Sequence, residues 1–224
     1  MPHFDIVKKS DIRSTFRVEK IKADFDVKIE HANERFVGKI DYPDNWRIGV
    51  IVGASGTGKS SIAKEMYGVD SMKQYEYTHS SVIDDMPDAD ISTITQMFYA
   101  VGFGSVPSWL KPYGVLSTGE KMRVDLARSM LEKDFIVFDE FTSVVDRNVA
   151  RTACIAINKA VHRLEKQFVA VSCHYDIIEW LQPDWVFDTN EMRCFFTTSH
   201  DHAKSSQSKR ASVANGKSLE SIII

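Results

Sequence analysis

Short apolar runs alternate with amphipathic stretches through most of the chain. Three compact runs are typical of strands buried on both faces of a parallel sheet, and they cover Arg47–Val52, Phe135–Asp139 and Phe168–Ser172. Helical periodicity lies between and around these runs, over Ser60–Tyr67, Ile91–Val101, Gly119–Glu132 and Arg147–Leu164. This alternation predicts an α/β fold with a mostly parallel sheet flanked by helices.

Other segments have the pattern of less buried strands. Phe16–Val27 and Phe36–Ile40 mix β-branched and aromatic residues with charges, which favours half-exposed antiparallel strands. Gln74–Ile83 is expected to form one more strand. Trp185–Phe187 and Met192–Thr197 predict a closing hairpin around the polar residues between them.

These elements predict one domain over residues 1–198. Within it, residues 16–52 would hold antiparallel strands and the first core strand, and residues 84–116 a short helical subdomain. The serine-rich remainder, 199–224, has few apolar residues before its last three, so we expect it to be disordered.

Composition indicates the kinds of partner and the cellular compartment that suit the protein. Lys+Arg number 28 and Asp+Glu 31, so no strong overall charge favours a nucleic acid or an anionic membrane as partner. The three cysteines are widely spaced, which is typical of a reducing compartment. No apolar run approaches the roughly 20 residues that span a bilayer, and the N-terminus lacks the pattern of a secretion signal. We therefore expect a cytoplasmic protein without membrane insertion.

The segment Gly53–Ser60 fits the phosphate-loop pattern G-x-x-x-x-G-K-S between a predicted strand and a predicted helix. Its glycines let backbone N–H groups approach a phosphate, and the helix start adds positive partial charge. Lys59 would reach the β- and γ-phosphates of ATP, and Ser60 would bind Mg²⁺. The predicted nucleotide-binding residues of this loop are Gly53, Ser55, Gly56, Thr57, Gly58, Lys59, Ser60 and Ser61.

Two acids, Asp139 and Glu140, follow the second apolar run. A buried parallel strand delivers such residues to the carboxyl edge of the sheet, where the phosphates are expected. Asp139 would hold Mg²⁺, and Glu140 would orient or deprotonate the attacking water. An acidic pair of this kind by itself also suits a helix cap or a solvated turn.

The segment Leu116–Arg128 resembles the signature and signature helix of ATP-binding cassette (ABC) ATPases. The resemblance implies that Ser117, Thr118, Gly119 and Glu120 contact the nucleotide of a second subunit, and therefore that a homodimer forms when ATP binds. Thr118 stands where the family more often has glycine, and Glu120 where it has glutamine. A capped helix start would give the same local pattern.

Two further matches follow in the order that the ABC family has. Ser143–Asp146 resembles the D-loop, which crosses the dimer interface, and this implies that Asp146 contacts the nucleotide of the second subunit. His174 resembles the histidine that contacts the γ-phosphate, and would join Glu140 and Lys59 as a catalytic residue. A histidine after a strand can equally be structural. The resemblance extends from about Phe16 to Thr197.

Two further residues, Asp84 and Phe25, are predicted to contact the nucleotide or its metal ion. The family's loop glutamine is missing after Ile83, and Asp84 is predicted in its place as a ligand of magnesium or of its water; a helix-capping acid is the alternative. Phe25 lies upstream at a distance that suits an aromatic ring stacked on adenine, although a core phenylalanine is more common.

The process that ATP drives has several candidates. Pro107–Tyr113 and Asp176–Trp185 resemble soluble ABC ATPases that are fused to a GNAT acetyltransferase-like domain, which implies a separate acetyltransferase-like partner; Trp109, Trp180 and Trp185 also suit ordinary packing. The short chain between Gly58 and Ser117 favours a soluble ATP-driven switch over a transporter subunit. A module that contacts nucleic acid through its basic tail is a third candidate.

Overall fold

The computed structural model describes residues 3–9, 14–26, 33–68, 72 and 75–197. Its central element is a five-stranded sheet in the order β4-β5-β3-β6-β7, in which β7 alone runs antiparallel to its neighbour. The strands are β3 (Ile48–Val52), β4 (Phe135–Phe138), β5 (Gln167–Ser172), β6 (Trp185–Asp188) and β7 (Arg193–Phe196). The mostly parallel sheet and the closing hairpin confirm the α/β prediction.

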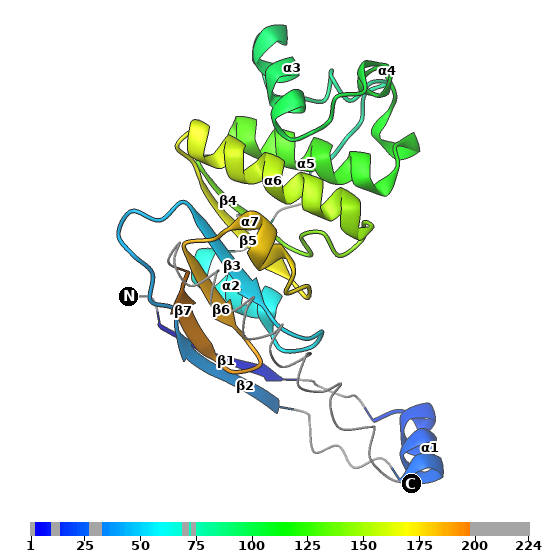
Figure 1. Cartoon of the computed structure of the whole chain (residues 1–224). Helices are drawn as coiled ribbons and strands as arrows, with labels where there is room; N and C mark the ends of the chain where they lie inside the picture. The colour runs from blue at the N-terminus through cyan, green and yellow to red at the C-terminus, as the bar shows by residue number, and fades with distance from the viewer. Residues whose placement is uncertain (1–2, 10–13, 27–32, 69–71, 73–74, 198–224) are drawn as a thin grey trace, which may run out of the picture.

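Helices cover both faces of this sheet (Figure 1). The helices are α2 (Lys59–Tyr67), α3 (Ile91–Ala100), α4 (Val106–Trp109), α5 (Thr118–Glu132), α6 (Arg147–Arg163) and α7 (Ile177–Leu181), with a short 3₁₀ turn, η2 (Tyr113–Val115). Side chains of β3 alternate between the two faces: Val50 packs in the cluster with α5 and α6, and Ile51 in the cluster with α2. This period of two places the core on both sides of a fully buried strand.

Close packing at the sheet centre depends on Gly49. A Cβ at this position would lie 2.0 Å from the indole ring of Trp185 on the neighbouring strand β6. Trp185 is fully buried and also packs against Trp46, with ring centroids 5.5 Å apart. The missing side chain in β3 therefore makes room for the large one in β6.

The N-terminal part differs from the sequence prediction. An antiparallel pair, β1 (His3–Lys9) and β2 (Asn33–Lys39), forms a separate sheet, and β1 was not predicted. The predicted strand Phe16–Val27 is wrong, because Phe16–Phe25 forms helix α1, which Figure 1 shows apart from the central sheet. Thr15 caps this helix by accepting the N–H of Val18. Local capping outweighs the β-propensity of the apolar residues in α1.

The predicted strand Gln74–Ile83 is also wrong over its described residues, 75–83, which form no regular element. The N–H groups of Val82 and Ile83 donate instead to the carbonyls of Lys111 and Trp109, at the C-terminal end of α4. This stretch is therefore attached to the helical segment, and β4 has β5 as its strand partner in the described part of the chain.

Candidate functional site

The phosphate loop joins β3 to α2 at the carboxyl edge of the sheet. Gly53, Gly56 and Gly58 have φ values of 155°, 87° and 81°, which side chains other than glycine rarely adopt. The backbone N–H groups of Ser55, Gly56 and Gly58 have no hydrogen-bond partner within the described residues. Next to Gly56 the space is open, since a Cβ there would meet no atom within 4 Å. The loop thus has free donors around an open position, as a phosphate requires.

Lys59 and Ser60 begin the helix that follows the loop. The ammonium group of Lys59 donates to the carbonyl of Ala54 at 2.6 Å, so it lies folded across the loop. Ser61 lies in the same first turn of α2 and is partly buried. A cation and a helix start on the same loop favour the binding of an anion.

Asp139 lies where the sequence predicted it, directly after β4. Its Oδ1 atom accepts a hydrogen bond from the hydroxyl of Ser60 at 3.0 Å and another from the N–H of Glu140 at 2.9 Å. A hydroxyl and a carboxylate that converge in this way fit Mg²⁺, which commonly binds to one or two protein oxygens together with phosphate oxygens. Two of the three predicted ligands, Ser60 and Asp139, therefore lie side by side, and their binding of Mg²⁺ stays a prediction.

Glu140 has a left-handed backbone, with φ of 51°, and Thr142 follows with φ of 64°. Such conformations cost roughly 1–2 kcal/mol for residues other than glycine. The N–H of Phe141, between them, donates to the carbonyl of Val171 at 2.8 Å and ties this turn to β5. Strained residues of this kind are concentrated at functional sites. Here the turn directs the chain away from β4 immediately after the two acids.

A cleft of about 720 Å³ opens beside these acids, and both Asp139 and Glu140 line it. Lys64 of α2 and Thr118 of the predicted signature line the same cleft. The first residues of α5 are therefore near the acids of their own chain. A second hollow, of about 530 Å³, is lined by Thr57 of the loop, by residues 35–37 of β2 and by the turn between β6 and β7.

The signature segment starts helix α5 with a capping box. The hydroxyl of Ser117 accepts the N–H of Glu120 at 3.3 Å, and the carboxylate of Glu120 accepts the N–H of Ser117 at 2.9 Å. Glu120 also accepts the hydroxyl of Ser108 at 2.7 Å, and these hydroxyl and backbone bonds lower its pKa. Gly119 lies against Val149 of α6, where a Cβ would approach within 3.3 Å. Within one chain, these residues thus have structural roles.

Asp146 and His174 belong to neighbouring parts of the carboxyl edge. Asp146 caps α6 by accepting the N–H groups of Asn148 and Val149 at 2.9 and 3.0 Å. His174 lies two residues beyond the end of β5 and is partly buried, and its N–H donates to the hydroxyl of Ser172 at 3.1 Å. Their contacts with a nucleotide stay predictions.

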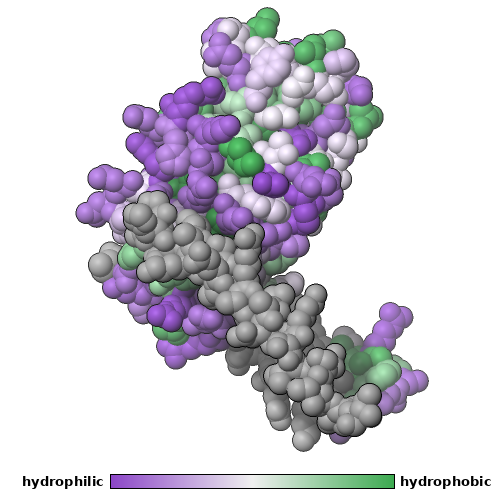
Figure 2. Space-filling view, in the orientation of Figure 1, coloured by the Kyte–Doolittle hydropathy of each residue, from purple (hydrophilic) through white to green (hydrophobic). Residues whose placement is uncertain are grey.

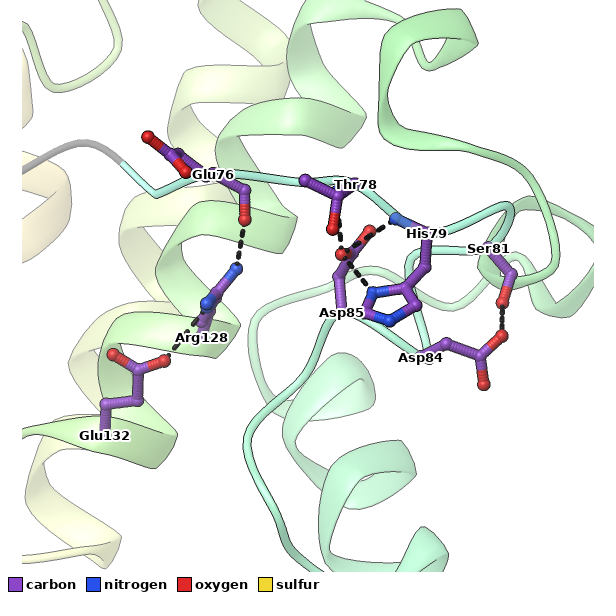
Figure 3. Close-up of polar contacts among 8 residues, drawn as sticks. All are labelled: Glu76, Thr78, His79, Ser81, Asp84, Asp85, Arg128 and Glu132. Carbon is purple, nitrogen blue, oxygen red and sulfur yellow. Dashed lines mark hydrogen bonds and ion pairs between the residues drawn. The ribbon is translucent and has the colours of Figure 1, made fainter.

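The structure does not support the prediction for Asp84. Its carboxylate accepts the hydroxyl of Ser81 in the turn that is attached to the α4 end, and Figure 3 shows the two side chains facing each other. Asp84 does not line the cleft beside Asp139. The neighbouring Asp85 is the structural acid here, because it accepts the N–H groups of Thr78 and His79 and the imidazole of His79 (Figure 3).

The prediction for Phe25 is corrected as well. Phe25 lies at the end of α1, 70% exposed, and not at the loop. The aromatic residue that does approach the loop is Phe36 of β2, whose ring atoms would lie 2.9 Å from a Cβ on Gly58. Phe36 also lines the 530 Å³ hollow. The period of two in β2 could have indicated which of its residues share a face, but not that this face meets the loop.

Sequence reasoning predicted the turn between β6 and β7 but missed its contacts with the phosphate loop. Asn190 accepts the N–H of Ala54 through Oδ1 at 3.1 Å, and Thr189 donates to the carbonyl of Val52 through its N–H and its hydroxyl. The hydroxyl groups of Thr57 and Thr189 lie 2.5 Å apart. Only glycine fits at position 53, because a Cβ there would lie 2.1 Å from Thr189 Oγ1. No sequence motif marks these contacts.

The known proteins that are similar to this chain bind ATP. No family model matches the chain. The energy-coupling factor transporter ATP-binding protein EcfA1 of Staphylococcus aureus is 26% identical in strain USA300, where the match spans 63% of this chain and 66% of the relative. In strain N315 the protein is 27% identical, with 69% and 72% spanned. The match thus spans about two thirds of these relatives.

Solved structures show the same fold. The dimeric post-hydrolysis state of the ATP-binding cassette MJ0796, bound to ADP and Pi, has a TM-score of 0.58 at 12% identity and covers 87% of this chain and 100% of that one. CbiO1 of Clostridium perfringens, part of the ABC transporter complex cbiONQ, has a TM-score of 0.59 at 16% identity and covers 93% and 94%. The chain has the fold of an ABC ATPase domain, and its relatives and structural neighbours together support the ABC ATPase superfamily.

Proposed function

We propose that this protein hydrolyses ATP with Mg²⁺ and that two copies complete each other's site. The observation that carries the proposal is the convergence of Ser60 and Asp139 beside the free N–H groups of the loop, with Glu140 next in the chain. The EcfA1 relatives are ATP-binding proteins of a transporter, and the structural neighbour MJ0796 is an ATP-binding cassette in a post-hydrolysis state with ADP and Pi, which supports ATP hydrolysis.

In this reaction the chain binds the phosphates of ATP, orients the attacking water and accepts its proton. The loop N–H groups and Lys59 bind the phosphates, while the Glu140 carboxylate orients a water molecule and accepts its proton as its oxygen attacks the γ-phosphorus. The bond from that phosphorus to the bridging oxygen breaks, and ADP and phosphate leave. Bound Mg²⁺ would neutralise the charge on the β- and γ-phosphate oxygens. His174 would donate to the γ-phosphate.

Phe36 is the best candidate for contact with the nucleotide base. It belongs to the hollow on the β2 side of the loop, together with Asn190 and Met192. An aromatic ring beside a phosphate loop can stack on adenine, and base stacking on such rings contributes about 1–3 kcal/mol. We therefore propose Phe36 in place of Phe25.

For the dimer, Ser117 and Gly119 would contact the phosphate of the opposite copy with the start of α5. MJ0796 is dimeric in two solved structures. Light scattering of the Glu140→Gln variant tests this point, because a variant that binds ATP without hydrolysing it should accumulate as a dimer. Glu132→Gln, which alters an exposed acid on α5, is the matched control. A Glu140→Gln chain that binds ATP and stays monomeric would contradict the composite site.

For the process, we propose the role of ATP-binding subunit in a membrane transport complex. The sequence favoured a soluble switch, but the EcfA1 relatives and CbiO1 fit the transport alternative better. The helical segment also exposes apolar side chains, visible over α3 and α4 in Figure 2. They are Ile91, Tyr99, Val106, Leu110 and Val115. In the described part of the chain, no helix is long and apolar enough to cross a membrane, so a transport complex would need another subunit.

Affinity purification from detergent-solubilised membranes tests the transport role. A polytopic membrane protein should co-purify with the chain, and Leu110→Glu, which places a charge on a side chain that is 67% exposed, should abolish that association while ATP still binds. Ile155→Glu on α6, 40% exposed, is the matched surface control. Association only with soluble proteins would favour the switch.

Two narrower predictions from the sequence stay untested. The acetyltransferase-like partner rests on resemblance alone. The contact with nucleic acid falls on residues 199–224, which lie outside the described residues. The same purification would detect either partner.

A further inference from the structure

The turn between β6 and β7 belongs to a closed hydrogen-bonded ring. Asn190 donates through Nδ2 to the hydroxyl of Tyr175 at 2.9 Å, and that hydroxyl donates to Asp188 Oδ2 at 2.8 Å. The other oxygen of Asp188 accepts the backbone N–H of Asn190 at 2.8 Å. Each of the three side chains thus orients the next, which limits the amide of Asn190 to one orientation.

That orientation matters because the remaining amide atom, Oδ1, accepts the N–H of Ala54 in the phosphate loop. Partial burial, together with the bond to Asp188, raises the pKa of Tyr175 to about 12. The phenol therefore stays protonated and able to donate at neutral pH. The ring holds the beginning of the loop from a segment that lies far away in the sequence.

Tyr175 also follows His174 directly. On the other side, Asp176 accepts two bonds from the guanidinium group of Arg147, one of them at 2.8 Å. Arg147 is in turn adjacent to Asp146. Residues 174–176 are thus attached to the phosphate loop through Tyr175 and to the start of α6 through Asp176.

We propose that Tyr175, Asp188 and Asn190 are positioning residues that hold the phosphate loop in its nucleotide-binding conformation and at a set place relative to His174. The inference rests on the proposed ATPase function and deepens it. A loop whose glycines have positive φ values can adopt many conformations when free. Holding one of them before ATP arrives removes an entropic cost from binding.

The test uses the full chain with Tyr175→Phe, Asn190→Ala and the double variant. The control is Tyr77→Phe, which removes a bond of similar length, 2.7 Å, from another tyrosine to the carboxylate of Asp125, away from the phosphate loop. Binding of a fluorescent ATP analogue with Mg²⁺ gives the Kd, phosphate release gives kcat, and thermal unfolding reports on stability.

We expect each single variant to raise the Kd about three- to tenfold, the range that the loss of one hydrogen bond produces. The double variant should weaken binding by less than the product of the two single effects, because both act through the same bond to Ala54. Tyr77→Phe should leave the Kd unchanged. Tyr175→Phe should lower kcat more than Asn190→Ala does, since it also loosens the segment of His174.

Unchanged Kd values in both single variants would overturn the inference, and so would effects that multiply in the double variant. A fall in Tm as large as that of Tyr77→Phe, without a change in Kd, would show a merely structural role. Failure of the proposed function is distinct, because the unaltered chain would then bind no ATP.

Discussion

The hydroxyl of Ser60 donates to Asp139 Oδ1 at 3.0 Å, although these residues follow strands that are not neighbours. Ser60 comes from the first turn of α2, after β3 and the phosphate loop. Asp139 follows the end of β4, and β5 lies between the two strands. Parallel strands end at the same edge, so their loops can converge across an intervening strand. This pair defines the place where the loop and the acids act together.

Lys59→Ala should abolish measurable ATP binding. The ammonium group of Lys59 lies folded over the loop at Ala54, close to the N–H groups that would bind phosphate, so its loss removes the loop's cation. With ATP at 100 times its Kd, the unaltered chain should gain about 2.7 kcal/mol of stability, and the variant none. Thermal unfolding with and without Mg-ATP measures the difference. Lys159→Ala, an exposed lysine on α6 that lines neither cavity, should keep the ATP-induced shift.

Gly49→Ala should lower the free energy of unfolding by about 1–3 kcal/mol, because the new methyl group would overlap the ring of the fully buried Trp185. Gly114→Ala is the matched control, since a Cβ there meets no atom within 4 Å. Urea denaturation of both variants provides the comparison. Equal stability of the two would contradict the packing described for β3 and β6.

Asp85 should contribute stability that depends on pH. Burial by itself would raise its pKa, but the bonds from the imidazole of His79 and from the N–H groups of Thr78 and His79 outweigh this effect and lower it. Its contribution is therefore complete above the unfolded pKa, about 3.9, and disappears as the pH falls through the lower folded value.

Asp85→Asn tests this expectation. The carboxylate is 3% exposed, so the variant should lose about 1–3 kcal/mol of unfolding free energy at pH 7. Below about pH 4 the difference in unfolding free energy between the variant and the unaltered chain should become smaller. Urea denaturation at pH 7, 5 and 3.5 measures it. Asp134→Asn, which alters an exposed acid, should differ from the unaltered chain by a small unfolding free energy that does not change with pH. A difference in unfolding free energy between Asp85→Asn and the unaltered chain that increases in acid would contradict the lowered pKa of Asp85.

Asp84→Ala should retain ATP hydrolysis within about twofold at saturating magnesium. The sequence predicted that Asp84 binds magnesium or its water. Its carboxylate instead accepts the hydroxyl of Ser81 and does not line the cleft of Asp139. Surface substitutions of this kind usually change stability by less than about 0.5 kcal/mol. Phosphate release at several magnesium concentrations measures the effect, and an increased magnesium requirement would restore the original prediction.

Most of the sheet and its helices could be predicted because their signals are local. The apolar run Ile48–Val52 is long enough for a buried strand, and the glycines that follow it identify the loop. Helix α1 was missed although Thr15 and Glu19 are typical of a helix start, because the apolar residues around them also suit a strand. The segment 75–83 was misread because its backbone partners, Trp109 and Lys111, lie at the C-terminal end of α4 and not in a strand.

The sequence by itself therefore determined the chemistry of the loop and the acids, since residue types at short, regular spacings identify Lys59, Ser60 and Asp139. The tertiary structure decided which distant side chains accompany them. It brought Phe36 to the loop, excluded Phe25 and Asp84, and placed Asn190 on Ala54. The physical reason is that a hydrogen bond between residues 136 positions apart depends on strand order and register, and these arise from packing of the whole core.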